Sequence, residues 1–397
     1  MEIAIIGAGI GGLTAASALI RKGVEVRIFE QADGIRQPGA GITVGGNAAR
    51  VLNQLGHGAL RERSGVASTA ARLHYWKDGQ VLAVGMTGGQ EAPPPDRPYT
   101  VHRLDLSQEL ASAVPPESLH FSWQCVAAEE DADGITAVFA DGSTVRADAL
   151  IAADGLHSRL RRLRVTEPPA TYSGRDVIRG LARLDDIDAR FAELTESWAW
   201  IGDGRFVLCY AIRSGQLINV VASFPGGQSL SDDWNVPQND DHRAVVLSAF
   251  AGWDEMLVRV LERMEITGRW GLVDREPVTG WSSGRMTLLG DAAHPMLPLY
   301  GQGANQAIED GYVLAECLEP TLAGIGDIRS ALDRYASTRA PRTSAIQLGS
   351  RENASGFYPH SGDLDTVKAA ALRMTGQIDA NYRKVFGHKV EDDLHPQ

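Results

Sequence analysis

Cysteine is scarce in this chain of 397 residues, which holds only Cys125, Cys209 and Cys317 and no Cys-x-x-Cys pair. Thiols so few and so scattered exclude a disulfide framework, and we expect no metal site. No apolar run approaches the ~20 residues that span a bilayer. The chain also lacks the basic start and long apolar core of a signal peptide, and its first motif begins at residue 7, so we expect no targeting segment. We therefore expect a cytoplasmic protein.

An excess of basic charge is missing as well, since the formal net charge is −12 and the pI is about 5.3. This balance disfavours nucleic acid or an anionic membrane surface as the main partner. Hydrophobic residues make up 44% of the chain and charged residues 22%, proportions typical of a soluble globular protein. The length is sufficient for two or three domains.

What the chain does have, at its start, is a strand, a glycine-rich turn, a helix and a second strand. Residues 2–6 form a short apolar run, and residues 7–12 read Gly-Ala-Gly-Ile-Gly-Gly. Residues 13–21 then read as a helix, and residues 24–29 as a strand that ends at Glu30. This order is typical of a dinucleotide-binding βαβ unit. The alternative is a structural βαβ unit without a ligand.

Each glycine has a physical reason in a dinucleotide site. Gly7 makes the tight turn, Gly9 lets a pyrophosphate approach the backbone, and Gly12 lets the helix pack close to the sheet. The helix N-terminus offers free N–H groups to the phosphates. Glu30 stands about where an acid binds the ribose hydroxyls. An acid there, in place of an arginine, argues against a 2′-phosphate, so we expect FAD or NAD rather than NADP.

Two further turns that carry an acid and a glycine follow apolar strands. Asp154-Gly155 begins a segment that runs to Arg161 and follows the apolar run 149–153, while Gly290-Asp291 follows residues 286–289. Alone, either aspartate could simply cap a helix. Ligands of open α/β sheets bind at the carboxyl ends of the strands. Three such turns together therefore indicate one shared site.

The middle of the chain has a different pattern. Residues 205–211 and 217–224 alternate in polarity, which favours an antiparallel sheet, and residues 240–265 look helical. We expect this inserted region to wall a pocket. The glycine-rich residues 33–45 read as a loop near the dinucleotide, and the last forty residues read as partly helical.

With these three motifs, the chain resembles the single-component FAD-dependent aromatic hydroxylases, in the branch that includes salicylate hydroxylase. The resemblance covers roughly residues 1–350 and is closest over residues 281–310. It implies an α/β fold like that of para-hydroxybenzoate hydroxylase: a Rossmann-type FAD-binding domain, an inserted, mainly antiparallel substrate domain, and C-terminal helices. The implied FAD-binding domain takes in residues 1–70, 100–170 and 276–325, the substrate domain residues 71–99 and 171–275, and the C-terminal helical segment residues 326–397.

The resemblance also implies the residues that hold the cofactor. Arg103 would pair with the pyrophosphate region, unless it is only a surface charge at a helix start, and Val126 would contact adenine. Asp154 would serve both FAD and the visiting NAD(P)H, and Asp291 would accept from ribityl or ribose hydroxyls. The full expected set is Gly7, Gly9, Gly11, Gly12, Glu30, Gln31, Arg103, Val126, Asp154, Asp291, Gly301, Gly303 and Ala304.

The implied activity is that of a monooxygenase. NADH or NADPH would reduce FAD, and O₂ would then give a flavin C4a-hydroperoxide that hydroxylates a phenolic or heteroaromatic ring. No second complete Gly-x-Gly-x-x-Gly occurs, which fits an NAD(P)H that has no Rossmann domain of its own. The alternatives are an epoxidase, a polyketide or quinolone ring hydroxylase, or a non-catalytic scaffold of the same fold. The expected partners are a small aromatic substrate and O₂, and the chain would be a monomer or homodimer.

The catalytic candidate is Tyr210. The corresponding stretch of the family often carries His-x-x-x-Tyr, and here the tyrosine matches Tyr210 while Phe206 occupies the histidine position. Tyr210 would assist deprotonation of the ring hydroxyl or bind its oxygen; the alternative is an ordinary inward-facing tyrosine. Phe206 suggests a more apolar or differently substituted substrate than salicylate. The nearby His294 is usually structural in the family.

Overall fold

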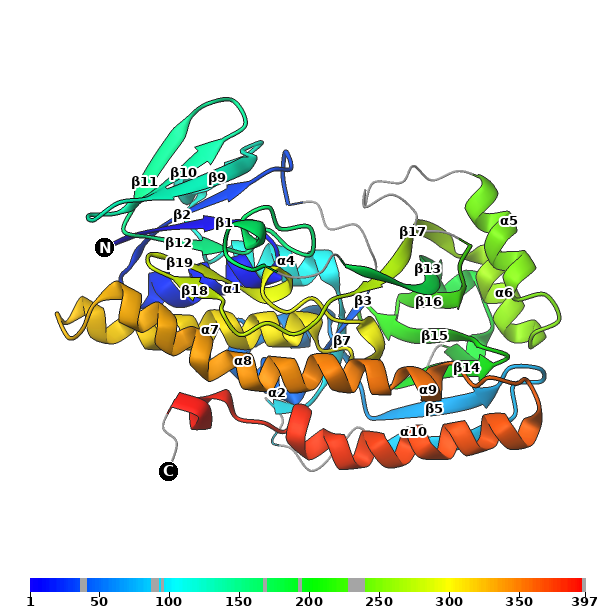
Figure 1. The fold of residues 1–397 in the computed structure, drawn as a ribbon. Coiled ribbons are helices and arrows are strands. Elements are labelled where there is room, and N and C mark those ends of the chain that lie inside the picture. Colours follow the sequence, from blue (N-terminus) through cyan, green and yellow to red (C-terminus); the bar gives the residue numbers. More distant parts are fainter. Residues whose placement is uncertain are drawn as a thin grey trace.

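Two large β-sheets of different construction organise the structure, and long helices join them (Figure 1). The computed structural model describes residues 1–35, 41–86, 93, 96–166, 170–191, 195–227 and 240–394. The first sheet contains the amino-terminal strand. The second carries the helices α5 (Asp240–Ala249) and α6 (Glu255–Arg263) on its outer side.

The first sheet has six strands in the order β18-β19-β12-β1-β2-β8, and those from β19 to β8 pair in parallel. Its strands are β1 Glu2–Ile6, β2 Glu25–Glu30, β8 Leu119–Phe121, β12 Ala149–Ala152, β18 Ser282–Ser283 and β19 Met286–Leu288. Because both faces are covered, β1 and β12 are almost wholly buried apolar runs. The predicted Rossmann-type sheet is thus confirmed.

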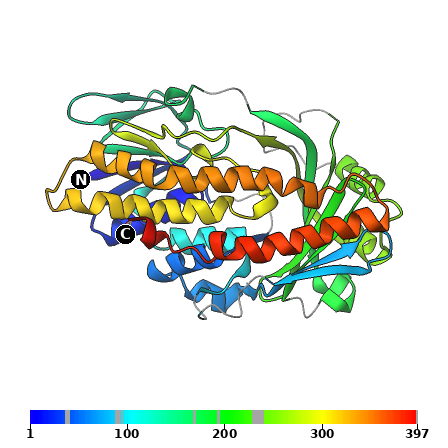
Figure 2. The same ribbon diagram turned by 60° about the horizontal axis from the view of Figure 1, so that its bottom comes forward.

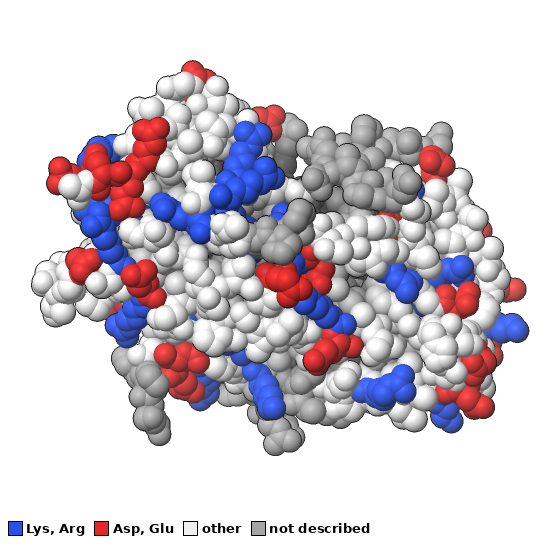
Figure 3. Space-filling model, viewed as in Figure 1, with Lys and Arg blue, Asp and Glu red and all other residues white. Residues whose placement is uncertain are grey.

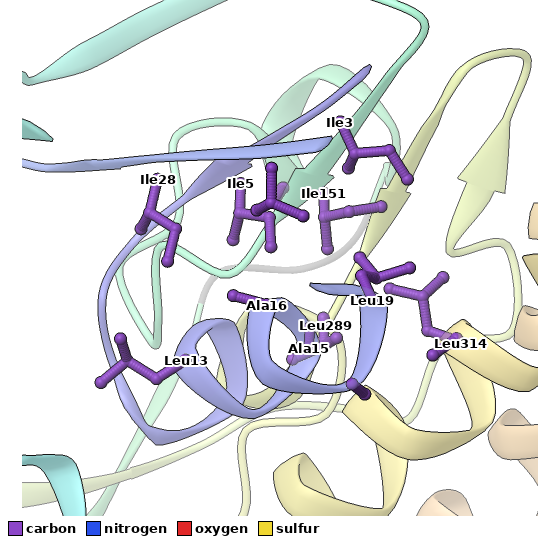
Figure 4. Close-up of a cluster of buried hydrophobic side chains, with 14 of the residues drawn as sticks. Ile3, Ile5, Leu13, Ala15, Ala16, Leu19, Ile28, Ile151, Leu289 and Leu314 are labelled. Atoms are coloured by element: carbon purple, nitrogen blue, oxygen red, sulfur yellow. The ribbon is translucent and has the colours of Figure 1, made fainter. Parts of the chain in front are cut away.

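Helix α1 (Ile10–Arg21) is packed between this sheet and helix α7 (Gly303–Leu322), so its residues from Ile10 to Leu19 are all buried. Figure 4 shows Ile5 and Ile151 of the strands lying over Ala16 of the helix. Small residues let the two helices approach closely, since a Cβ at Gly311 of α7 would lie 2.7 Å from the backbone N of Ala15. This contact sets the position of the α7 N-terminus relative to the glycine-rich turn.

The second sheet has seven strands in the order β17-β13-β16-β15-β14-β5-β6. They are β5 Ala70–Tyr75, β6 Val81–Met86, β13 Thr171–Arg183, β14 Glu196–Gly202, β15 Arg205–Ile212, β16 Leu217–Pro225 and β17 Glu265–Asp274. Every pairing is antiparallel except that of β14 with β5. One face buries Ile178 and Val220 against Leu257 of α6. The predicted, mainly antiparallel sheet is confirmed; its assignment to a domain of residues 71–99 and 171–275 stays a prediction.

Smaller strands and helices complete the fold. They are the strands β3 Gly41–Val44, β4 Val66–Ala67, β7 Tyr99–His102, β9 Cys125–Glu130, β10 Ile135–Phe139 and β11 Thr144–Ala147, and the helices α2 Gly46–Gln54, α3 Ala59–Ser64 and α4 Arg103–Ala111. The expectation of a loop through residues 33–45 is wrong for residues 41–44. These form β3 because β7, distant in sequence, supplies their hydrogen-bond partners. Residues 36–40, with Pro38, lie outside the described residues.

The C-terminal helices return along the molecule. They are α8 Ile328–Glu352, α9 Ala354–Phe357 and α10 Leu364–Val385. Figure 2 shows α8 lying along α7 and reaching toward the second sheet, while α10 runs back from that sheet. Helix α10 packs on β5 and β6, and Val390 and Leu394 then join the core of the first half. The predicted C-terminal helices are confirmed, and they join the two halves.

A buried network of charges fastens α8 to α7. Arg339 of α8 donates to Glu309 and Asp310 of α7, at 2.7 Å in both cases, and all three side chains are fully buried. Arg342 also donates to Glu309, at 2.9 Å. Burial alone would raise the pKa of Glu309, but the two arginine charges outweigh it and hold that pKa at about 2. Glu309 is therefore ionised and fully paired at neutral pH.

Two features of the surface complete the description. Within the described residues, no helix is both long and apolar enough to cross a membrane. On the face shown in Figure 3, acidic and basic side chains are interspersed over both halves of the molecule.

We predict that Arg339→Met lowers the free energy of unfolding by about 3–5 kcal/mol, because two buried carboxylates lose the arginine they share and keep Arg342 and His294. Chemical denaturation followed by circular dichroism measures this loss. The matched control is Arg329→Met on the same helix, whose half-exposed guanidinium bonds Glu130 at 2.9 Å. That change is expected to cost at most about 1 kcal/mol. Equal losses in the two variants would contradict the role given to the buried network.

Candidate cofactor and substrate site

The three predicted turns leave neighbouring strands of the first sheet. The glycine-rich turn follows β1, the Asp154 turn follows β12, and the Asp291 turn follows β19, and these strands lie side by side in the order β19-β12-β1. Parallel pairing brings their carboxyl ends to one edge of the sheet. The structure therefore brings together three motifs that the sequence separates widely.

The glycines of the first turn differ in what surrounds them. Gly7 has φ +108°, and a Cβ there would lie 2.3 Å from the carbonyl O of Ala153. A Cβ at Gly12 would lie 2.1 Å from the carbonyl O of Gly7, so this glycine sets the close packing of helix on turn. A Cβ at Gly9 would meet no protein atom within 4 Å. The open side of the turn is therefore at Gly9, where a ligand is expected to approach.

Gly11 is explained by close packing between protein elements. A Cβ there would lie 2.6 Å from Cδ2 of Leu289 and 3.2 Å from Cβ of Ala307. This glycine therefore lets α1 approach the strand end of β19 and helix α7. Its contact with the cofactor stays a prediction.

Glu30 lies at the end of β2, beside the glycine-rich turn. Its carboxylate accepts from the backbone N–H of Ala8 at 2.8 Å and from that of Ala32 at 2.9 Å. Each oxygen has further lone pairs for a ribose hydroxyl. Trp123 N donates to Glu30 O at 2.8 Å, which brings the start of β9, with Val126, close to this end of the site. Gln31 follows Glu30 and is exposed.

The Asp154 side chain stabilises the turn in which it lies. Its carboxylate accepts from Ser158 Oγ at 2.5 Å and from Arg159 N at 2.9 Å, and burial raises its pKa while these bonds oppose that shift. Two residues further on, buried Arg161 donates to the carbonyls of Ala292 and Ala293 at 2.7 and 2.6 Å. The turn that begins at Asp154 is thus hydrogen-bonded to the turn that contains Asp291. The carboxylate closes its own turn and does not cap a helix, since the short helix Arg161–Leu163 that follows has no side-chain cap.

Asp291 and the start of α7 form the third part of the site. Asp291 is exposed, and a Cβ at Gly303 would lie 3.6 Å from its Oδ1. Gly301 has φ +60° and open space around it, and α7 begins at Gly303 without a side-chain cap. The first N–H groups of α7, including that of Ala304, are therefore available to a ligand.

His294 does not share this exposure. It is buried, and its Nε2 lies 2.6 Å from Oδ2 of Asp310, the acid that also receives Arg339. This arrangement agrees with a structural histidine that fixes the loop after Asp291.

Arg103 begins α4 at the side of the site that faces the second sheet. Its Nε is buried and has no hydrogen-bond partner among the described residues. Burial lowers its pKa, the charge of Arg179 on β13 lowers it further, and Asp291 acts in the opposite direction. Arg103 therefore lies within electrostatic reach of both residues. Its contact with a pyrophosphate stays a prediction.

Tyr210 lies on β15, on the sheet face that is turned toward β3. It pairs across the strands with Asn219, whose Oδ1 accepts from Gly41 N at 2.7 Å. A Cβ at Gly41 would lie 2.6 Å from the ring of Tyr210, so only glycine fits β3 at this point. Burial raises the pKa of Tyr210 to about 12, against the opposing effects of Arg179 and Asn219. Tyr210 is therefore a neutral phenol at physiological pH.

Phe206, which replaces the family's histidine, lies four residues before Tyr210 on β15 and on the same face of the sheet, where it packs against α9. It is 4% exposed and packs on Phe357 and Tyr358, with ring centroids 4.8 and 5.3 Å apart. The substitution therefore belongs to an apolar cluster with α9. Its effect on substrate choice stays a prediction.

One residue of the site was missed by the sequence analysis. Arg179 is the one charged residue of the stretch 177–181 within β13, and its Nε is buried without a hydrogen-bond partner among the described residues. An arginine between apolar residues of this stretch was the available signal. What the sequence could not provide was its proximity to Tyr210 and Arg103.

The residues present fit a flavin dinucleotide. Open backbone at Gly9, the uncapped start of α7, the exposed acceptor Asp291 and the unpartnered Nε of Arg103 together offer what an anionic, hydroxyl-rich cofactor requires. Comparison with known proteins points the same way: residues 1–348 match the family described as FAD binding domain.

Two curated relatives and one solved structure extend the comparison. The 3-amino-4-hydroxybenzoate 2-monooxygenase of Streptomyces platensis is 37% identical over 389 residues, covering 97% of this chain and 96% of the relative. The 6-hydroxynicotinate 3-monooxygenase of Pseudomonas fluorescens is 33% identical, with 89% and 91% covered. HpxO of Klebsiella pneumoniae, solved with FAD and uric acid, superposes with a TM-score of 0.84 at 29% identity, with 99% and 97% covered.

We predict opposite behaviour for two alanine substitutions in the first turn. Gly9→Ala is expected to change the unfolding free energy of the flavin-free protein by no more than about 0.5 kcal/mol, yet to lower flavin content, because its methyl group occupies the ligand side. Gly12→Ala is expected to cost about 1–3 kcal/mol through overpacking. Flavin absorbance per chain and denaturant unfolding measure the two effects. Full flavin content in Gly9→Ala would show that the cofactor does not approach this turn.

Proposed function

The chain belongs to the family of FAD-dependent aromatic monooxygenases, and from this premise we propose that it hydroxylates an aromatic acid whose ring also carries a hydroxyl or amino group. Its relatives are named hydroxylases and monooxygenases, so the chain is an enzyme rather than a scaffold of the same fold. The acid class is supported by the names of the relatives, which specify hydroxylated benzoate and nicotinate rings. Epoxidation, or hydroxylation of a polyketide or quinolone ring, is the alternative.

FAD is the cofactor, and we propose how this chain holds it. Gly9 and the start of α1 face the pyrophosphate together with Arg103, and Glu30 accepts from the adenosine ribose, with Gln31 and Val126 nearby. Asp291 accepts from flavin-side hydroxyls, and Gly301, Gly303 and Ala304 present backbone N–H groups to the ring. The chemistry that bound FAD supplies is activation of O₂ with electrons from NADH or NADPH.

Tyr210 is the proposed catalytic residue. Because its pKa is raised to about 12, its hydroxyl keeps its proton and donates a hydrogen bond to the oxygen of the substrate's ring hydroxyl. Such a bond stabilises the phenolate, which is the electron-rich form that accepts an electrophilic oxygen. The single observation that supports this proposal is that Tyr210 packs against Gly41 of β3, on the sheet face of Asn219, while Arg179 acts on the pKa of both Tyr210 and Arg103.

The remaining properties are also proposals. O₂ is the co-substrate, and NAD(P)H reaches the flavin near Asp154 without a Rossmann domain of its own. We propose a cytoplasmic location, supported by three cysteines that are all free thiols. The chain is proposed to act as a monomer or homodimer.

The direct test uses the purified holoenzyme with 3-amino-4-hydroxybenzoate, 6-hydroxynicotinate and 3-hydroxybenzoate. At least one acid is expected to stimulate NAD(P)H oxidation and to yield a product one oxygen atom heavier, with the label coming from ¹⁸O₂. Benzoate, which lacks the activating group, is the control and is expected to give no hydroxylated product. If flavin-loaded protein forms no oxygenated product from any hydroxylated ring acid, the proposed substrate class is wrong.

We predict that Tyr210→Phe lowers the rate of hydroxylation by about 10²-fold, because it removes the donor to the ring oxygen. The rate of flavin reduction by NAD(P)H is expected to stay near that of the wild type, so more of the consumed NAD(P)H appears as peroxide. Tyr358→Phe is the matched control, since that hydroxyl bonds Ser223 at 2.8 Å on the same sheet face. Unchanged coupling of NAD(P)H use to product in Tyr210→Phe would remove Tyr210 from the mechanism.

A further inference from the structure

A buried side-chain amide lies between the second sheet and strand β3. Asn219 of β16 is fully buried and lies directly opposite Tyr210 of β15, so the two side chains are neighbours on the same face of the sheet. The Oδ1 atom of Asn219 accepts from the backbone N–H of Gly41 at 2.7 Å. The Nδ2 atom is buried too, but it makes no hydrogen bond of normal geometry with a described residue. One end of this amide therefore has a protein partner, while the other end keeps its two donors.

The contact with Gly41 fixes which way the amide points. A backbone N–H can only donate, so the amide atom that faces it must be the oxygen. Turning the amide over would place an NH₂ group against that N–H and would leave both groups without an acceptor. The nitrogen of Asn219 is therefore held on the side of the amide that does not face Gly41.

Strand β3 is in turn held at its other end by a second side-chain amide. Asn305, in the first turn of α7, accepts from the backbone N–H of Gly45 at 2.8 Å and donates to the carbonyl O of Thr43 at 3.0 Å. The helix whose N-terminus is proposed to meet the flavin ring thus also sets the position of β3. Through Gly41, it sets the orientation of Asn219 as well.

Tyr210 is the polar side chain next to the amide. A Cβ at Gly41 would lie 2.6 Å from the ring of Tyr210 and 2.9 Å from Cγ of Asn219, so both side chains meet at this glycine. Burial raises the pKa of Tyr210, and Asn219 opposes that shift, as a donor to the phenol oxygen does. The donors of Asn219 are therefore placed beside the phenol group.

We propose that Asn219 is a positioning residue whose Nδ2 donates to the oxygen of Tyr210 and thereby directs the tyrosine proton to the substrate; this inference rests on the proposed function. A phenol oxygen has one proton to donate and lone pairs that accept. Because an amide NH₂ group cannot accept, Tyr210 cannot direct its proton to Asn219. The Nδ2 contact shortens when substrate binds, since catalytic hydrogen bonds are often long until the ligand is in place.

The resulting chain of hydrogen bonds runs in one direction. The N–H of Gly41 donates to Oδ1 of Asn219, Nδ2 donates to the oxygen of Tyr210, and the phenol O–H donates to the ring oxygen of the substrate. Hydrogen bonds in such a chain polarise one another, so each donor is strengthened by the bond that its own group accepts. Asn219 therefore both orients the phenol proton and makes Tyr210 a stronger donor.

The experiment measures coupling, the amount of hydroxylated product per NAD(P)H oxidised, in the holoenzyme with 3-amino-4-hydroxybenzoate, 6-hydroxynicotinate and 3-hydroxybenzoate. Asn219→Asp keeps an oxygen for Gly41 but presents an acceptor to Tyr210, and Asn219→Ala removes both groups. Each change is also combined with Tyr210→Phe. The control is Ser223→Ala on the same strand and face, which removes a hydrogen bond of 2.8 Å to Tyr358.

Asn219→Asp is expected to lower kcat for hydroxylation about 10-fold, the effect of one hydrogen bond, with KM and flavin reduction within about twofold of the wild type. The loss, relative to the wild type at the same pH, should shrink as the pH is lowered, because protonation of the new carboxyl restores a donor. In the Tyr210→Phe background, neither change at Asn219 should lower coupling further, because the amide acts through the tyrosine hydroxyl. Ser223→Ala should match the wild type.

Two results with the variants would overturn the inference. Wild-type coupling in Asn219→Asp would show that no donor is needed at this position. An equal loss with and without the Tyr210 hydroxyl would show that Asn219 only anchors β3. Failure of the proposed function is distinct, because it appears as an absence of oxygenated product in the wild type.

A crystal structure of the wild-type holoenzyme with 3-hydroxybenzoate gives a test that needs no variant, should the substitutions prevent folding or flavin binding. Nδ2 of Asn219 is expected within about 3.2 Å of the Tyr210 oxygen, a normal hydrogen-bond distance. Contact of Nδ2 with the bound acid, in place of the tyrosine, would make Asn219 a substrate ligand and would contradict the positioning role.

Discussion

The parallel pairing of β19, β12, β1 and β2 is the constraint on which the rest of this structure depends. Parallel strands place their carboxyl ends at one edge, so three turns from distant parts of the chain must meet there. Contacts between the turns then fix their geometry. The Gly7 turn closes against Ala153, and Arg161 bonds the carbonyls of Ala292 and Ala293. A cofactor that spans the edge meets one rigid surface rather than three loops.

Buried charges on helices α7 and α8 support that surface, in addition to apolar packing. Helix α7 begins beside Asp291, and its buried acids Glu309 and Asp310 are neutralised by Arg339 of α8. The same protein leaves Arg103 and Arg179 without partners among the described residues at the site itself. The support pairs its buried charges, while the Nε atoms of the two arginines at the site have no hydrogen bond to a described residue, and this difference is expected where ligands supply the missing partners.

The two faces of the second sheet have different roles: one stabilises the fold, and the other is expected to bind the substrate. One face is buried against α5 and α6, while the other carries Tyr210, Arg179 and partly exposed apolar residues toward the flavin half. Alternation along a strand makes this division possible, because neighbouring residues point to opposite faces. The relatives share the fold but are named for different ring substrates. Differences in specificity are therefore expected on this face rather than in the motifs of the first sheet.

Whether a feature could be predicted from the sequence depends on how far apart in the chain its interacting residues lie. The glycine-rich turn and the acid-glycine turns could be predicted because each is a local conformation with its own residue requirement, as φ +108° at Gly7 illustrates. Strand β3 was read as a loop because glycines dominate its neighbourhood and its partners, β7 and Asn219, lie far along the chain. Arg179 could not be singled out from the sequence, because its environment, in which the described residues place no acid within ion-pair distance, is formed by distant strands.

The sequence by itself determined the class of fold, the cofactor family and the positions of the three turns, since these follow from short-range patterns of glycine, acid and apolar residues. Tertiary structure alone decided which face of the second sheet meets the flavin half, that Gly41 packs on Tyr210, and that Phe206 joins the α9 cluster. Those outcomes depend on strand register and on contacts between elements more than 100 residues apart, which no local pattern encodes.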